Sequence, residues 1–127
     1  MTLDEFRTYF ESYRRSADRE AREQKDSFRV LEKLRALYES FDPSMRAMAR
    51  FVLSEWALSE DESVRFDALA LIDELKVVTA MTALEALASR LQTCDTPGAP
   101  YELNKVQRIV KHLSQSRESP SDLSTEP

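Results

Sequence analysis

The chain has 127 residues, of which 42% are hydrophobic and 32% are charged, and its formal net charge is −5. A chain of this length buries roughly two thirds of its unfolded surface, so we expect one domain with its own core. The acidic balance argues against unspecific binding to nucleic-acid backbone, which requires a basic surface. One glycine and five prolines leave long stretches without a helix breaker, which predicts an all-α fold.

The cellular location is predicted from three features of the sequence. The single cysteine, Cys94, excludes an internal disulfide. The first residues lack the apolar run of a secretory signal, and no apolar stretch approaches the roughly 20 residues that a membrane helix requires. We therefore expect a cytoplasmic protein without membrane association.

Residues 1–42 are expected to form an N-terminal helical section. Thr2 and Glu5 fit a capping box at the start of a helix from about Leu3. Residues 14–27 are rich in opposite charges four positions apart but contain little to bury. One long helix and a helical hairpin both fit this pattern, and we favour two helices with a charged connection.

Aromatic residues are concentrated near the start of this section. Four lie within eight positions, namely Phe6, Tyr9, Phe10 and Tyr13. They either cap a stack of helices or contact a partner, since a tyrosine can pack its ring while its hydroxyl stays in water. Capping is the favoured interpretation.

The next helix is expected to begin at Pro43 and to run to about Leu58. Asp42 fits its N-cap, and a proline is well tolerated at the first helical position. Trp56 lies on the main apolar face and is expected in the core, whereas Phe51 lies on the opposite face. A helix that is apolar on two sides is expected to lie between neighbouring helices.

Residues 61–91 form two short amphipathic helices joined by a minimal turn. They contain an Asp-x-x-Val-Arg-x-x-Ala pattern and an Ala-Leu-x-x-Leu run, at Asp61, Val64, Arg65, Ala68, Leu75, Ala83, Leu84 and Leu87. This pattern resembles a HEAT-type helical repeat. The resemblance implies a short α-solenoid of stacked antiparallel helical hairpins, with residues 43–92 as its core and one or two repeats. Such stacks usually bind other macromolecules.

The end of the chain contains one further expected helix. Residues 93–100 contain the only glycine and two prolines and are expected to form a loop. A last helix is predicted over residues 101–114, and residues 116–127 are too polar to pack and are expected to be disordered. The prediction is thus a single helical-repeat domain over residues 1–115, with about five to six helices.

No set of residues indicates catalysis, a metal or a cofactor. Consecutive carboxylates, as in residues 60–62, lie at a helix start and fit a solvated surface better than an acid–base pair in a pocket. His112 is the only histidine, and neither it nor Cys94 has a neighbour at a metal-ligand spacing. A phosphate-binding glycine loop is also absent from the sequence. We therefore expect a protein that is not an enzyme and has no cofactor.

The predicted partner-binding residues lie on the helix that begins after Asp61. Phe66 points away from the main apolar stripe and is flanked by carboxylates, the setting of an anchor for a basic partner. The alternative, burial of Phe66 against a neighbouring helix, is favoured because central helices of a solenoid are apolar on both sides. The other members of the predicted partner-binding set are acidic residues that are expected to be solvated. The full set is Glu62, Phe66, Asp67, Asp73 and Glu74.

A basic strip on the last helix supports only a weak nucleic-acid hypothesis. It consists of Lys105, Arg108, Lys111 and His112. Surfaces that follow a nucleic-acid backbone are normally much wider, so a solvated face is favoured. Nucleic acid is therefore not an expected partner.

These observations predict a binding protein. Its general type is similar to small bacterial HEAT-like immunity proteins, which block a cognate toxin by occluding its active site. The acidic charge suits a basic toxin domain, because complementary potentials speed association. The alternative is an adaptor or assembly subunit of a larger complex, with the N-terminal section available for self-association. The oligomeric state stays open.

Overall fold

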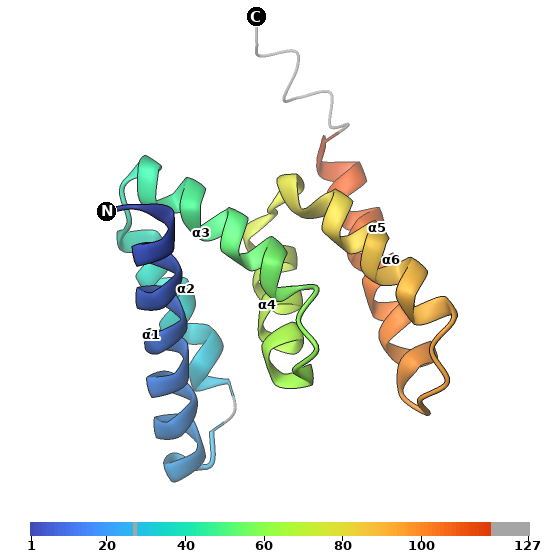
Figure 1. Ribbon diagram of the computed structural model, residues 1–127, viewed down its shortest axis with the longest axis horizontal. Helices are drawn as coiled ribbons and strands as arrows, with labels where there is room; N and C mark the ends of the chain where they lie inside the picture. Colours follow the sequence, from blue (N-terminus) through green and yellow to red (C-terminus); the bar gives the residue numbers. More distant parts are fainter. Residues whose placement is uncertain (27, 118–127) are drawn as a thin grey trace, which may run out of the picture. The chain divides into compact units, whose positions relative to one another are not determined.

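The computed structural model describes residues 1–26 and 28–117 and contains no strand within them (Figure 1). The helices of this part are α1 Leu3–Gln24, α2 Arg29–Ser40, α3 Pro43–Trp56, α4 Glu62–Leu75, the short 3-10 helix η1 Val78–Ala80, α5 Met81–Gln92 and α6 Ala99–Arg117. The all-α prediction and the expected number of helices are confirmed for this part of the chain. None of the described helices combines the length and the apolar composition needed to cross a bilayer.

The chain divides into two compact units, Met1–Val52 and Leu53–Pro127. The division lies within α3, after the helix start that was expected at Pro43. The first unit contains α1, α2 and the beginning of α3, whereas the second contains α4, η1, α5 and α6. The expected single domain over residues 1–115 stays a prediction.

In the first unit, α1 and α2 form the helical hairpin that was favoured from the sequence. The capping box is confirmed, because the Thr2 hydroxyl accepts a hydrogen bond from the Glu5 amide and the Glu5 carboxylate accepts one from the Thr2 amide. The expected charged connection is wrong, since α1 continues to Gln24. Opposite charges on successive turns favour this helix, and buried alanines at Ala17 and Ala21 give the charged stretch a packing face.

Three phenylalanines form the centre of the first unit's core. The ring of Phe41 lies 5.5 Å from that of Phe6 and 6.1 Å from that of Phe10, both in tilted or edge-on arrangements that aromatic pairs prefer. Phe6 and Phe10 are buried, and Tyr9 at the edge is 38% exposed. The two phenylalanines of the N-terminal cluster are therefore core residues.

The start of α3 is as predicted, but its second apolar face is not covered. The Asp42 carboxylate accepts a hydrogen bond of 2.8 Å from the Met45 amide, as an N-cap does. Trp56 is buried, which confirms its core placement, whereas Phe51 is 50% exposed. The sandwiched position expected for α3 is thus wrong at Phe51. The Arg7 guanidinium lies 5.7 Å from the centre of the Phe51 ring instead.

In the second unit, local capping sets the bounds of α4. The Asp61 side chain accepts hydrogen bonds from the amides of Ser63 and Val64, which satisfies two orphan donors of the first turn. The helix ends at Leu75, and its C-cap Lys76 has a left-handed backbone (φ 56°) that turns the chain out of the helix. The main apolar side chains of this unit are buried, namely Leu53, Leu69, Leu71, Ile72, Val77, Leu84, Leu87, Val106, Ile109 and Leu113.

Helices α5 and α6 pack against each other as an antiparallel pair (Figure 1). The last helix begins at Ala99, earlier than the predicted residue 101, because a proline such as Pro100 is accepted in a first helical turn. It also continues to Arg117, past the expected end at residue 114. The tail predicted over residues 116–127 therefore begins in helix, and its remainder lies outside the described residues.

Candidate functional site

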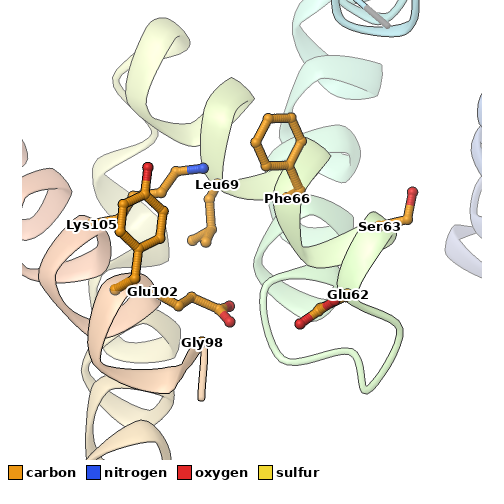
Figure 2. A pocket seen from close by; sticks show the side chains of 8 residues that line it. Glu62, Ser63, Phe66, Leu69, Gly98, Glu102 and Lys105 are labelled. Carbon is orange, nitrogen blue, oxygen red and sulfur yellow. The ribbon is translucent and has the colours of Figure 1, made fainter. Parts of the chain in front are cut away.

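A groove lies between α4 and the start of α6, wholly within the second unit (Figure 2). Its volume is about 480 Å³, within the range of ligand-binding clefts. The residues that line this α4–α6 groove are Glu62, Ser63, Phe66 and Leu69 from α4, and Gly98, Tyr101, Glu102 and Lys105 from the other side. Side chains of both helices therefore form one recessed surface.

An ion pair joins the two walls of the groove. Arg65 Nε lies 2.7 Å from one carboxylate oxygen of Glu102, and Arg65 Nη2 lies 2.9 Å from the other. The third nitrogen, Nη1, donates to the Ser59 carbonyl at 3.0 Å. Both side chains are largely buried, and hydrogen bonding to Glu102 is the main reason that the pKa of Arg65 is raised. This bidentate contact fixes the start of α4 against α6.

A second polar contact joins the same helices further along. His112 Nδ1 lies 3.2 Å from the Asp73 carboxylate. It is a partly exposed contact, so its contribution to stability is modest. Together with the Arg65–Glu102 pair, it joins α4 and α6 at two positions along their length.

The side chain of Lys105 lies over the ring of Phe66. Its ammonium nitrogen is 4.1 Å from the ring centre, close enough for a cation–π interaction. Within residues 1–26 and 28–117, this ammonium makes no hydrogen bond or ion pair. Burial away from water lowers the pKa of Lys105, because desolvation disfavours the charged form.

Aromatic surface and acidic charge surround this cation. Phe66 is 51% exposed and Tyr101 is 80% exposed. At the start of α4, the carboxylates of Glu60 and Glu62 are exposed to solvent. The groove thus has an aromatic surface, one cation inside it and an acidic rim.

The structure brings together two of the five predicted partner-binding residues, since Glu62 and Phe66 line the groove. The favoured burial of Phe66 is wrong, because 51% of this side chain is exposed. Asp73 lies on α4 and contacts His112, whereas Glu74 is exposed and does not line the groove. The expected exposure of Asp67 is wrong: this side chain is only 6% exposed and is not accessible to a partner.

Sequence reasoning missed the wall that α6 contributes. Lys105 was assigned to a solvated basic strip, but it contacts Phe66, and His112 of the same strip contacts Asp73. Of that strip, Arg108 and Lys111 stay exposed. Charge complementarity was the one available signal for the partner of Arg65, yet carboxylates along the whole chain match it as well as Glu102 does.

Side chains that bind metal ions do not gather in the described part of the chain. No cluster of three or more His, Cys, Asp or Glu side chains there is able to hold a metal ion. Cys94 is exposed in the loop after α5, where its sulfur lies 3.3 Å from the Thr96 hydroxyl, and this contact lowers the pKa of the thiol. The groove itself presents aromatic surface and charge.

Comparison with known proteins does not assign the chain to a family. No protein-family model, curated protein or solved structure matches the chain. The function is therefore argued from the groove and its residues.

Proposed function

We propose that this chain is a non-catalytic protein-binding module whose partner docks on the α4–α6 groove. The proposal is carried by the half-exposed ring of Phe66, which Lys105 holds in place beside the exposed Tyr101. The buried centres of interfaces are enriched in aromatic side chains, which are surrounded by a polar rim. A ring that is already positioned loses little freedom on binding, which favours affinity.

In its most specific form, the proposal is a cytoplasmic immunity protein with a HEAT-like arrangement of helices that occludes a cognate toxin. The net charge of −5 and the exposed carboxylates of Glu62 and Glu74 favour a partner with a basic surface. In the HEAT-like pattern, Asp61 caps α4 and Arg65 fixes α4 to α6. Both residues support a rigid surface, which an occluding inhibitor requires.

The test begins with capture of the partner by tagged protein, followed by mass spectrometry. The captured partner is then purified, and its enzymatic activity is measured while the chain is added in increasing amounts. The inhibitor hypothesis predicts a fall in activity that is complete at equimolar protein. Full activity at saturation would eliminate inhibition, even where the two proteins bind each other.

An adaptor is the second candidate, and the two-unit organisation favours it. The first unit has exposed aromatic surface of its own at Phe28, which is 69% exposed, in addition to the groove in the second unit. An adaptor binds two partners at once or self-associates, so its complexes exceed one-to-one mass. Light scattering across a range of concentrations separates the two functions, because an inhibitor complex keeps a constant one-to-one mass.

A further inference from the structure

We infer that the α4–α6 groove receives an apolar side chain of the partner that has a carboxylate beside it, and that it rejects cationic side chains. This inference rests on the proposed function and adds the chemistry of the residue that enters the groove. The groove contains a cation, Lys105, whereas the chain as a whole is acidic and favours a basic partner surface. The rim and the interior of the groove therefore select different features of one partner.

One cation of the groove, Lys105, contacts no carboxylate among the described residues. Both carboxylate oxygens of Glu102 are engaged by Arg65, and the Asp73 carboxylate contacts His112. Lys105 lies on the groove wall, where its ammonium contacts only the Phe66 ring among the described residues. A partly buried ammonium with unused donors is best satisfied by a carboxylate, through a charge-assisted hydrogen bond.

The rest of the lining is suited to an apolar body. Phe66 and Tyr101 offer exposed aromatic surface, and the buried side chain of Leu69 closes the groove between them. Aromatic rings gain from contact with another ring or an aliphatic chain beyond the area buried. The volume of about 480 Å³ accommodates one large side chain with its flanking backbone.

A lysine or arginine side chain is disfavoured in this interior. It would lose water while it approached Lys105, and the carboxylate on the same wall, that of Glu102, already accepts hydrogen bonds from Arg65 at both oxygens. Like charges brought together at an interface suppress binding strongly. Glu62 at the rim remains exposed and is free to attract basic residues that flank the anchor without entering the groove.

Three small probes test this inference on the isolated chain, by titration followed through backbone amide signals in nuclear magnetic resonance. They are N-acetyl-phenylalanine with a free carboxylate, its neutral N-methylamide, and the N-methylamide of N-acetyl-arginine. We expect the acid to shift the amides of Phe66, Gly98, Tyr101 and Lys105 and to bind about fivefold more tightly than the neutral amide. The arginine probe is expected to give no saturable shift at these amides.

Variants assign the selectivity to its residues. Lys105→Met should make the acid and the amide bind equally, and Lys105→Arg should retain the preference for the acid. Gly98→Trp should block both, because Gly98 lines the groove and an indole there would fill it. A Cβ at this position meets no atom within 4 Å and the backbone has no positive φ, so the fold should be retained. Phe51→Ala, in the other unit, should leave every probe unchanged.

The inference is overturned if acid and amide bind the wild-type chain equally, if the arginine probe binds at the groove amides, or if Gly98→Trp has no effect. These outcomes differ from failure of the proposed function. If a captured partner binds Phe66→Ala as tightly as wild type while the isolated chain still distinguishes the probes, only the proposed function is overturned. A partner that depends on Phe66, together with no probe binding, would overturn only the chemistry inferred here for the anchor.

Discussion

Aromatic residues have opposite environments in the two units of this protein. In the first unit, Phe6 and Phe10 are 0% and 1% exposed and form a core with Phe41, whereas Phe66 and Tyr101 of the second unit are 51% and 80% exposed. The core rings are covered by other rings. Phe66 is instead held by a lysine on one side and left in water on the other. The difference separates aromatic residues that stabilise the fold from those available for recognition.

Phe51 of the first unit sharpens this comparison because it shares two properties with Phe66. It is 50% exposed, and a cation, that of Arg7, lies over its ring. The cavity beside Phe66 is the difference, since Phe51 does not line the α4–α6 groove. Phe51 is therefore the matched control for every test of Phe66.

The largest expected effect concerns the core ring. Phe10→Ala should lower the free energy of unfolding by about 3–5 kcal/mol, because it removes a buried side chain and leaves a cavity. Phe66→Ala should cost less than about 1 kcal/mol, since half of the ring is already in water. Urea unfolding followed by circular dichroism measures both. Equal losses would contradict the assignment of one ring to the core and the other to recognition.

The next effect separates the groove ion pair from an exposed one. Arg65→Met should cost about 2 kcal/mol, because it leaves the largely buried Glu102 carboxylate without its partner. Arg22→Met removes an exposed pair with Asp18 on α1 and should cost less than about 0.5 kcal/mol. A double-mutant cycle with Glu102→Gln isolates the interaction. Coupling no larger than that of the α1 pair would show that the groove walls are not fixed by this contact.

Charge at the rim should affect the rate of association with a captured basic partner. Glu60→Lys combined with Glu62→Lys should slow association about tenfold at low salt, and the effect should fade as ionic strength rises. Stopped-flow or surface-based kinetics measure the rate. Glu32→Lys combined with Glu39→Lys, at two exposed positions of α2, changes the net charge equally and should have little effect. Similar slowing by the rim variants and the α2 variants would mean that the association rate depends on the net charge of the chain and not on charge at the rim.

The smallest effect is a pH dependence that arises from Lys105. Burial lowers its pKa in the folded state below the ordinary value of 10.5, so the folded protein releases this proton before the unfolded chain does. Stability relative to Lys105→Met should therefore rise with pH between the lowered pKa and 10.5. Urea unfolding of both proteins from pH 7 to 11 measures the difference. A difference that falls over this range would show that attraction to the Phe66 ring outweighs desolvation.

The sequence predicted those features of the fold that depend on neighbouring residues in the chain. Thr2 and Asp42 were identified as helix caps because a cap is recognised within one helical turn. The exposure of Phe66 and the burial of Asp67 were not predicted, because helix periodicity shows which face a residue occupies but not what covers that face. The groove itself depends on α6 lying beside α4, and no local pattern places Lys105 over Phe66.

The central claim, that the α4–α6 groove is the binding surface, is tested most directly by capture on three immobilised proteins. Wild type, Phe66→Ala and Phe51→Ala are exposed to an extract of the cells that make the chain, and the retained partner is quantified by mass spectrometry. Phe51→Ala should retain the partner as wild type does, and Phe66→Ala should retain at least about tenfold less at limiting concentration. Equal retention by the two variants, or a loss confined to Phe51→Ala, would contradict the claim.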